Sequence, residues 1–336
     1  MLIRLATAED DAAIAAYVTA HSSATAFHRI EWGRAVAQGC RQRAHVLVAG
    51  NMQGILSLTE LHSPLFGRAL ASSGFAVGGG ILCDDAATGE ALAAEAVALA
   101  ARLSCQNVEL RGGYLPKYWT RDETTYLGFV RDLADGDEAE LRLIPRKQRA
   151  EVRRALGFDL TTDIGDRDAH YHVYATSVRN LGTPVFPRPL FDAVLESFGG
   201  DADVLTVRRD GEPLASVLSL YHRGAVLPYW GGGTSAARTW RANDMMYFAL
   251  MQHARKRGCT RFDFGRSKAG TGAAAFKYNW GFVGEPLRYA SKTAAGFVKR
   301  SVNPLDPKYR LQVKLWSKLP LAVANRLGPM ISRGLG

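Results

Sequence analysis

One pattern occurs twice in this chain, about 155 residues apart, and it constrains the fold more than any other feature. The segments "HVLVAGNMQGILSLTEL" (residues 45–61) and "DVLTVRRDGEPLASVLSL" (residues 203–220) each predict two strands joined by a turn, the second through an Asp-Gly pair. Each hairpin is followed by a glycine triplet, then a helical stretch, then a short strand. Four matching elements in one order predict a duplicated unit.

The duplication predicts an α+β fold of two tandem lobes, each with a mostly antiparallel central sheet flanked by helices. A polar, acidic stretch, "DLADGDEAE", separates the two copies. We therefore expect an amino-terminal lobe over residues 1–140, a second lobe over residues 141–290, and a basic tail over residues 291–336. The paired helices are expected at 89–105 and 242–259, and the short strands at 107–112 and 261–266.

Composition favours a globular protein of the cytoplasm. The chain has 336 residues, 47% of them hydrophobic, which is enough to bury a sizeable core. It lacks a basic-then-apolar amino-terminal signal and any apolar run of 18 residues. Four scattered cysteines without a C-x-x-C pair suit reduced thiols, and we expect no metal site.

The net charge of +10 is concentrated in two segments. Residues 142–154 carry six bases against one acid, and residues 299–336 carry eight bases against Asp306, which leaves the rest of the chain slightly acidic. We expect no DNA binding. Both segments, the first of which includes Arg146 and Lys147, predict contact with a phosphorylated substrate or an anionic surface, although solvated helix faces have the same composition.

The stretch "FDFGRSKAGTGAAAFKYNWGF" (residues 262–282) concentrates glycines, bases and aromatic residues. Gly265 and Gly270 have the spacing of a phosphate-binding loop, but no lysine and hydroxyl pair follows them, and no kinase motif accompanies the "DFG". Glycines that open a helix beside cations still favour an anion site. Arg266, Ser267 and Lys268 are its predicted members, unless the glycines only permit a turn.

The second copy resembles the GNAT acyltransferase fold, with "FKYNWGF" at the end of its last helix. Together with "IPRKQRAEVRRAL", "VRNLGTPVFPRPLF" and "GGGTSAARTWRANDMM", the two copies resemble the FemAB-related family, in the branch associated with exosortase/PEP-CTERM systems of Gram-negative bacteria. The resemblance is strong over residues 140–290 and weaker over residues 1–135. It implies an N-acyltransferase that moves an aminoacyl or acyl group onto an amine of a cell-envelope or exopolysaccharide precursor.

The resemblance also implies which substrate contacts to expect. Trp32 and Arg34 match the first lobe's contribution, and "NLGTPVFPRPLF" lies beside the family's substrate groove. Trp32 is equally suited to a core, and the proline-rich segment is equally suited to a rigid connector. Tyr229 and Trp230, the aromatic pair before the second glycine triplet, are suited to a core or to a wall of the acceptor site. The remaining predicted substrate residues are Arg179, Phe186, Arg188, Tyr229, Trp230, Asn243 and Phe276.

One departure from the resembling fold concerns the acyl donor. Members that use acyl-CoA place a glycine-rich loop before the long helix, whereas this chain has "RTWRANDMM" (residues 238–246). We therefore expect no tightly bound cofactor and a donor that is charged tRNA, or another activated acyl group, rather than acetyl-CoA.

Lys277 is the predicted catalytic residue. It follows Phe276 in a helix that is otherwise small or aromatic, where a lone cation is unusual. A cation beside the developing oxyanion would lower the barrier of acyl transfer, and the resembling aminoacyl ligases have a lysine at this place. Asp263 is a second candidate, which would accept the amine proton or orient the acceptor. The alternative is that the Lys277 ammonium reaches solvent while its stem is buried.

The tail from about Tyr309 onward interleaves apolar residues with lysines and arginines. This pattern predicts a peripheral contact of residues 309–336 with the inner membrane surface, unless Pro320 breaks the helix and the apolar residues pack on the second lobe. The expected partners are a phosphorylated, nucleotide-linked or lipid-linked precursor and charged tRNA. Two other functions stay open: a non-catalytic GNAT-like scaffold of an exosortase-associated exopolysaccharide locus, and an acyl-CoA-dependent N-acetyltransferase.

Overall fold

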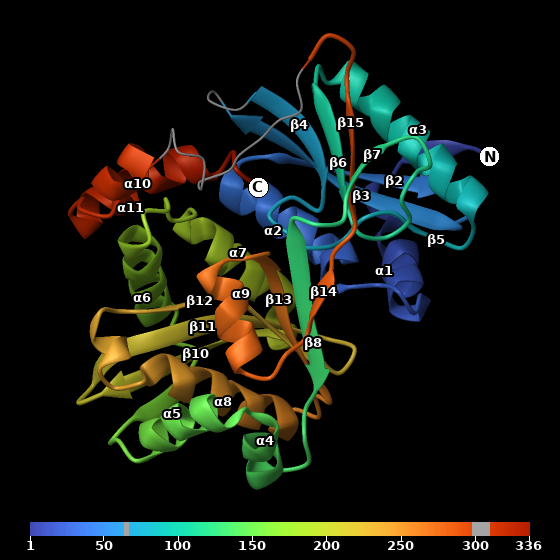
Figure 1. The fold of residues 1–336 in the computed structure, drawn as a ribbon. Coiled ribbons are helices and arrows are strands. Elements are labelled where there is room, and N and C mark those ends of the chain that lie inside the picture. Colours follow the sequence, from blue (N-terminus) through green and yellow to red (C-terminus); the bar gives the residue numbers. More distant parts are fainter. Residues whose placement is uncertain (64–66, 298–309) are drawn as a thin grey trace.

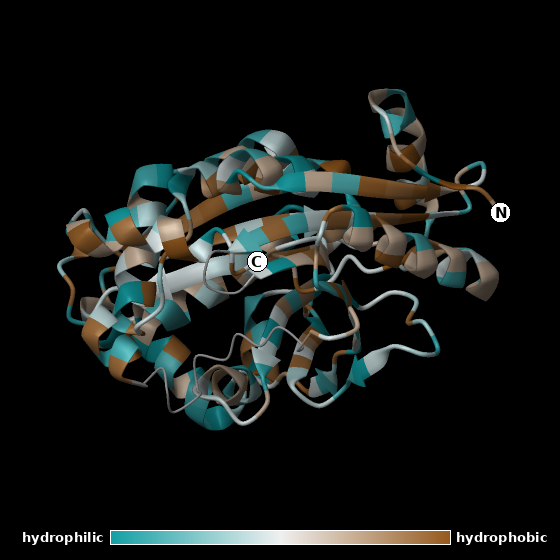
Figure 2. Cartoon of the chain, turned by 90° about the horizontal axis from the view of Figure 1, so that it is seen from above, coloured by the Kyte–Doolittle hydropathy of each residue, from teal (hydrophilic) through white to brown (hydrophobic). Residues whose placement is uncertain are grey.

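The computed structural model describes residues 1–63, 67–297 and 310–336, and the chain forms two lobes that each contain a sheet with helices against it (Figure 1). Hydrophobic residues recur along the strands of both sheets, as the view from above shows (Figure 2). Both sheets are mostly antiparallel and each includes one parallel pair of strands. The α+β architecture predicted from the duplication is confirmed.

The sheet of the first lobe has eight strands in the described residues. One of them, the short strand β5 (Leu82–Cys83), lies outside the main order and pairs with β3 (Gly54–Ser63). Across the sheet the order is β1 (Ile3–Leu5), β2 (Arg43–Ala49), β3 (Gly54–Ser63), β4 (Gly67–Ser72), β6 (Asn107–Arg111), β15 (Tyr289–Thr293) and β7 (Thr120–Asp122).

The sheet of the second lobe has seven strands in the part of the chain that the structure describes. Its predicted hairpin forms with Asp210 and Gly211 at the turn, both at positive φ. Across this sheet the order is β14 (Gly284–Pro286), β8 (Tyr126–Asp132), β13 (Arg261–Lys268), β12 (Ala225–Gly233), β11 (Glu212–His222), β10 (Ala202–Arg209) and β9 (Thr161–Ile164).

Several helices begin at capping residues or directly after prolines. The side chains of Asp85, Asp166 and Thr271 each accept a hydrogen bond from a backbone N–H in the first turn of their helix. The helices are α1 (Asp11–Ala20), α2 (Ile30–Cys40), α3 (Ala86–Arg102), α4 (Asp137–Leu143), α5 (Arg146–Leu156), α6 (Arg167–Asn180), α7 (Arg188–Phe198), α8 (Ala242–Lys256), α9 (Gly272–Asn279), α10 (Arg310–Trp316) and α11 (Leu321–Ser332).

The two sheets exchange strands across the predicted lobe boundaries. Strand β8 precedes residue 140 but pairs with β13 in the second sheet, from Arg261↔Asp132 to Lys268↔Tyr126. Strand β15 returns to the first sheet and pairs with β6. The division at residues 140 and 290 stays a prediction, and these two strands tie the lobes to each other.

A shared aromatic core joins the lobes. Trp32 of α2 is fully buried and packs against Tyr229 and Trp230 of β12. Its indole Nε1–H donates to the Gly74 carbonyl at 3.0 Å, and the Tyr229 hydroxyl donates to the Phe75 carbonyl. Because these contacts bury large rings and pair their polar atoms, they hold the lobes in one arrangement.

Strands β12 and β13 separate soon after they meet. Their parallel pairing covers Ala225↔Arg261 and Val226↔Phe262, whereas β13 continues to pair with β8 on its other side. The β13–β8 ladder is interrupted between Asp263 and Arg266, where Gly265 has φ +66°. The separation leaves room beside the carboxyl-terminal half of β12.

The tail packs on the body with one face and exposes the other. Tyr309, where the predicted membrane segment begins, and the bases Lys299, Arg300 and Lys308 lie outside the described residues. Pro320 separates α10 from α11, as one alternative expected. The Ser332 hydroxyl donates to the Val185 carbonyl at 2.7 Å, and Gln42 of the first lobe donates to the Arg333 carbonyl at 2.7 Å. The most exposed apolar side chains of the tail are Leu311, Leu315 and Met330.

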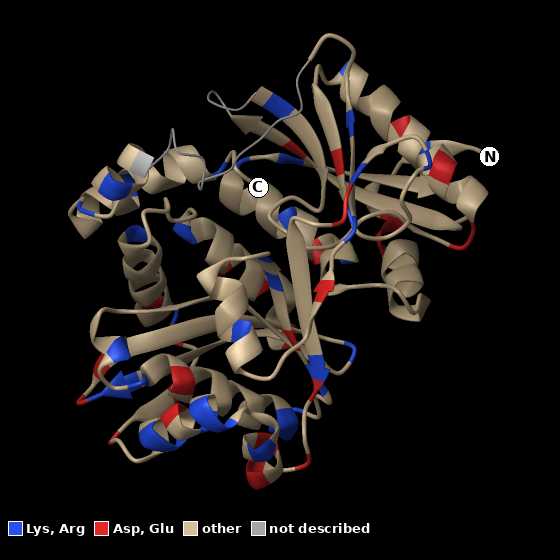
Figure 3. Ribbon diagram, viewed as in Figure 1, with Lys and Arg blue, Asp and Glu red and all other residues tan. Residues whose placement is uncertain are grey.

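Figure 3 shows bases on α5 and on the tail helices. No helix in the described ranges has the length and apolar content that crossing a bilayer requires.

Candidate functional site

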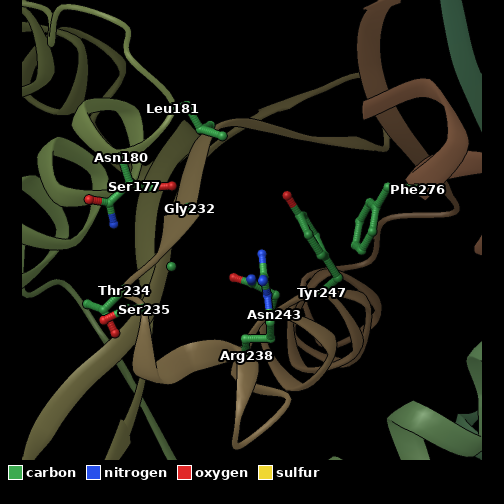
Figure 4. A pocket seen from close by; sticks show the side chains of 11 residues that line it. Ser177, Asn180, Leu181, Gly232, Thr234, Ser235, Arg238, Asn243, Tyr247 and Phe276 are labelled. Carbon is green, nitrogen blue, oxygen red and sulfur yellow. The ribbon is translucent and has the colours of Figure 1, made fainter. Parts of the chain in front are cut away.

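A cavity of about 460 Å³ lies in the second lobe, where β12 has parted from β13. Its size falls in the range of small-molecule sites. The walls come from the end of α6, the end of β12, the loop after it, the first turns of α8, and α9 (Figure 4). The lining residues are Ser177, Asn180, Leu181, Gly232, Gly233, Thr234, Ser235, Arg238, Asn243, Tyr247 and Phe276.

Two polar atoms of this wall lack hydrogen-bond partners. Asn243 Oδ1 and Thr234 Oγ1 are buried, and no described residue bonds either atom. Buried polar groups are nearly always paired, so each of these calls for a ligand or water. The Asn243 amide can present its oxygen or its NH₂ group, and the Thr234 hydroxyl can donate or accept. The Thr234 hydroxyl can donate to the carbonyl of a bound acyl group, whereas Asn243 Oδ1 is an acceptor and suits an amine N–H.

Aromatic side chains form the opposite wall. Tyr247 lies one helical turn after Asn243, so both side chains project from one face of α8. The Tyr247 ring packs on Phe264 with centroids 4.7 Å apart and on Phe276 at 5.6 Å. Its hydroxyl points into the cavity (Figure 4). Burial raises the pKa of Tyr247 to about 12, so the hydroxyl is a hydrogen-bond donor at neutral pH.

The start of α8 is occupied by charged residues instead of glycines. Arg241 precedes the helix with φ +53° and pairs with Glu151 of α5. Asp244 lies in the first turn, where Gln148 Nε2 donates to it at 2.6 Å, and burial raises its pKa to about 6. An acidic side chain here occupies the positive end of the helix dipole, which an incoming phosphate would otherwise use.

Lys277 is buried and does not reach solvent. Its ammonium donates to the carbonyls of Gly265 at 3.1 Å and Arg266 at 3.0 Å, and it lies 5.2 Å from the centre of the Phe129 ring. Burial lowers the pKa of Lys277 to about 8. The side chain thus secures the interruption in β13, and it does not line the cavity that the neighbouring Phe276 lines. Its catalytic role stays a prediction.

Asp263 lies on the other side of the same interruption. The Gly265 N–H donates to Asp263 Oδ1 at 2.9 Å. Burial raises the pKa of the Asp263 carboxyl, while the Lys277 ammonium acts in the opposite direction. The structure therefore brings the two predicted catalytic residues around Gly265, outside the lining of the cavity.

The predicted anion cradle does not assemble. Residues 266–268 belong to β13 and pair with β8, so alternate side chains face opposite ways. Arg266 donates to the Tyr289 hydroxyl at 3.0 Å and lies over the Tyr126 ring, Ser267 is buried, and Lys268 is partly exposed. Because a strand replaces the expected loop, these three side chains do not converge on one point.

Four predicted substrate residues belong to the core between the lobes. Trp32 and Trp230 are buried, and Tyr229 is partly buried with its hydroxyl bonded to Phe75, so the structure places them as the core alternative expected, and their contact with substrate stays a prediction. Phe186 packs on Phe75 and Trp230. Burying large rings at this junction stabilises the contact between the lobes, which accounts for the aromatic cluster.

The five predicted basic contacts are also dispersed. Arg34 pairs with Asp11 and Arg188 with Asp168, and all four side chains are at least a third exposed. Arg179 donates to the Ser317 carbonyl at 3.4 Å and so ties α6 to the tail. The structure places the remaining two, Arg146 and Lys147, at the exposed start of α5.

Of the predicted residues, only Asn243 and Phe276 line the cavity. The sequence contains a signal for some of the residues that were missed. Hydroxyl and basic residues follow the glycine triplet in "GGGTSAAR", and Tyr247 shares a helical face with Asn243. Ser177, Asn180 and Leu181 come from another helix, which no local pattern connects to this loop.

Comparison with known proteins gives the class of this lobe. Residues 139–278 match the model of the acetyltransferase (GNAT) domain, a range that includes every residue lining the cavity. No curated protein matches the sequence. The second lobe carries a GNAT domain, and the chain is an acyltransferase.

Solved structures share the two-lobe architecture at low sequence identity. FemX is 15% identical with a TM-score of 0.65, over 86% of this chain and 97% of FemX. The C-terminal domain of a putative lysylphosphatidylglycerol synthetase from Agrobacterium fabrum is 17% identical with a TM-score of 0.59, over 86% of this chain and 93% of that domain. A tandem GNAT protein from the clavulanic acid biosynthesis pathway is 14% identical with a TM-score of 0.56, over 88% of this chain and 99% of that protein. These likenesses agree with two GNAT-like lobes.

Proposed function

We propose that this protein is an N-acyltransferase that moves an aminoacyl or acyl group from an activated ester to an amine of a cell-envelope or exopolysaccharide precursor. In the reaction the amine nitrogen bonds to the acyl carbon, the ester C–O bond breaks, and the amine loses a proton. Support comes from the resemblance to the FemAB-related family, with which the likeness to FemX agrees, and from the likeness to a putative lysylphosphatidylglycerol synthetase, whose name gives an aminoacylated lipid as product. The exosortase-associated branch stays a prediction.

The unsatisfied polar wall of the cavity carries this proposal. Acyl transfer builds negative charge on the carbonyl oxygen, and hydrogen-bond donors already in place stabilise it. The Thr234 and Tyr247 hydroxyls would supply such donors within one cavity, and Asn243 Oδ1 would accept a hydrogen bond from the attacking amine. The aromatic wall of Tyr247 and Phe276 would pack against the acyl side chain and exclude water from the ester.

The proposed donor is charged tRNA or another activated acyl group, with no tightly bound cofactor. The start of α8 supports this choice, since it has Arg241 and Asp244 where a pyrophosphate-binding loop would have glycines. An acidic first turn opposes a phosphate at that place. An acyl-CoA-dependent N-acetyltransferase is therefore the second candidate, favoured only by the match to the acetyltransferase model.

Titration calorimetry of the purified protein with charged tRNA and with acetyl-CoA tests the donor. We expect charged tRNA to bind more tightly than the same tRNA without its aminoacyl group, because the cavity takes the acyl part. Acetyl-CoA binding in the micromolar range would overturn this choice of donor. If neither donor binds, the result contradicts charged tRNA as donor and favours the GNAT-like scaffold.

The proposed acceptor is a phosphorylated, nucleotide-linked or lipid-linked precursor that is met at the inner membrane surface. Support comes from the tail, whose exposed Leu311 and Leu315 alternate with the exposed Lys314 and Lys318. Apolar residues beside bases favour the interface of an anionic membrane.

A further inference from the structure

A second hollow, of about 240 Å³, lies on the first lobe and has no part in the cavity described above. It forms where α2 ends, β2 begins, and β3 and β4 lie side by side. The lining residues are Arg41, Gln42, Arg43, Glu60, His62 and Arg68. Three guanidinium groups in one hollow point to an anionic ligand.

The charges within the hollow do not cancel. Glu60 is buried, and its carboxylate is bound by Arg68 at 2.5 Å, with His45 3.5 Å from its other oxygen. Arg41 and Arg43 are exposed, and neither guanidinium group makes a hydrogen bond or ion pair with any residue in the described ranges. Two positive charges therefore remain for a ligand after the internal pair is counted.

The backbone conformation of Arg41 is also unusual for an arginine. Arg41 has φ +53° at the end of α2, a left-handed conformation that usually selects glycine. Glycine would relieve that conformation but would remove one of the two free guanidinium groups. The other two arginines at positive φ, Arg223 and Arg241, use their side chains to bind protein groups, whereas the Arg41 guanidinium is left for a ligand.

The residues near the hollow favour one class of anionic ligand. Gln42, one of the lining residues, donates to the carbonyl of Arg333 directly after α11. The last two turns of α11 expose Leu327 and Met330 beside the exposed Arg326, within about 10 Å of that end at 1.5 Å rise per residue. The helix that ends at this basic hollow thus exposes aliphatic residues in its last two turns.

We propose that this hollow binds the phosphodiester of an anionic phospholipid, with Leu327 and Met330 in the adjoining membrane interface. Guanidinium groups pair with phosphate oxygens in two parallel hydrogen bonds, and nearby aliphatic side chains gain by entering the headgroup region. An RNA site would instead combine a long basic groove with aromatic rings on which bases stack. Among the lining residues the one ring is the imidazole of His62, and there is no phenylalanine, tyrosine or tryptophan on which bases would stack.

This inference deepens the proposed function by giving the protein a defined orientation on the membrane where its acceptor is met. Co-sedimentation with vesicles of equimolar phosphatidylcholine and phosphatidylglycerol tests it without any turnover, so failure of the acyl-transfer proposal would not affect the result. The test variant is Arg41→Ala/Arg43→Ala. The matched control is Arg153→Ala/Arg154→Ala, which removes the same charge from the exposed face of α5.

We expect the test variant to lose at least about tenfold in vesicle affinity, and the control to lose less than about threefold. Leu327→Ser/Met330→Ser should weaken vesicle binding as well, while circular dichroism shows all variants folded. Pure phosphatidylcholine vesicles should not bind. Equal losses in the test and control variants would mean a diffuse charge effect and overturn the site.

Two further arms decide the source of the phosphate. Glycerol 3-phosphate, measured by calorimetry, should bind far more weakly than vesicles, because it offers no apolar surface. If it binds as tightly as vesicles, the hollow is a site for soluble phosphates and the lipid proposal is wrong. If Arg41→Ala/Arg43→Ala abolishes binding of unacylated tRNA but leaves vesicle binding intact, the hollow is an RNA site.

Discussion

The two lobes share one scaffold but differ where their parallel strands meet. In the second lobe, β12 and β13 pair at Ala225 and Val226 and then diverge around the cavity. In the first lobe, β4 and β6 pair from Ala69 to Ala71, and Ile81 then bridges to the residues that follow β6. The first lobe therefore closes the gap that the second lobe keeps open.

A single aromatic side chain completes that closure. Tyr114 lies so close to α3 that a Cβ on Gly89 would come within 2.3 Å of its ring, and its hydroxyl donates to Glu90 at 2.9 Å. In the second lobe, the corresponding turn of α8 begins with Asn243 and leads to Tyr247, both of which face the cavity. Duplication has thus preserved the sheet and helix in both lobes, while the open gap with its cavity lies in the second.

The largest expected effect tests how tightly the gap of the first lobe is closed. A Cβ on Gly80 would lie 1.9 Å from the backbone oxygen of Gly112, whereas one on Gly233 would meet the Asn243 side chain at 2.6 Å. We expect Gly80→Ala to lower the free energy of unfolding by about 3 kcal/mol or more, because backbone has to move. Gly233→Ala should cost about 1 kcal/mol, because side chains can shift into the cavity. Urea denaturation measures both, and equal losses would contradict the comparison.

The next effect concerns the open gap. Asn243→Ala should lower acyl-transfer turnover about a hundredfold, because it removes a hydrogen-bonding group from the cavity. Its effect on the free energy of unfolding should be small, since Asn243 Oδ1 bonds no described residue. Tyr114→Phe in the closed gap is the matched control and should leave turnover unchanged. Full turnover in Asn243→Ala would move the reaction out of the cavity.

Local patterns account for what the sequence predicted. Hairpins and helices follow from alternation, helical periodicity and turn residues such as Asp210 and Gly211, all of which act between near neighbours. The exchange of β8 and β15 between the sheets depends on pairing across long separations, which no local pattern encodes.

The site residues show the same limit. Aromatic residues such as Trp32, Tyr229 and Trp230 occur both in substrate-binding walls and in cores. Here they lie in the core because α2 packs against the second lobe. Lys277 stood out as a lone cation, but its partners are carbonyls exposed by the interruption of β13. That interruption depends on Gly265 and on pairing with β8, so the environment of Lys277 could not be read from its own helix.

A smaller effect follows from Lys277 itself. Lys277→Met should lower the free energy of unfolding by about 2 kcal/mol at pH 7, because two buried carbonyls lose their donor. The folded pKa of about 8 lies below the unfolded value of 10.5, so the unfolded chain binds more protons between these pH values. Wild-type stability should therefore gain from this group as pH rises from about 8 to 10.5, and Lys277→Met should lack that gain. Denaturation curves across this pH range measure it, and parallel pH profiles would contradict the assignment.

The same variant separates the structural and catalytic roles of Lys277. Turnover is measured at a temperature where circular dichroism shows Lys277→Met folded. A further loss of about a hundredfold would support catalysis, as would failure of added stabilising osmolyte to restore activity. Turnover that follows the folded fraction would leave Lys277 as a support for β13 and assign the chemistry to the cavity.

The smallest effects are expected at one exposed ion pair in each lobe. Arg34 pairs with Asp11 in the first lobe and Arg188 with Asp168 in the second, and in both pairs solvent reaches the charges. Exposed pairs contribute at most about 1 kcal/mol, so Arg34→Ala and Arg188→Ala should each change the free energy of unfolding by less than that amount. Neither side chain lines the cavity, so KM for the acceptor should stay within about twofold of wild type. A tenfold rise in KM for Arg188→Ala alone would show that the acceptor extends from the cavity along α7, and the same rise for Arg34→Ala would show that the first lobe also contacts it.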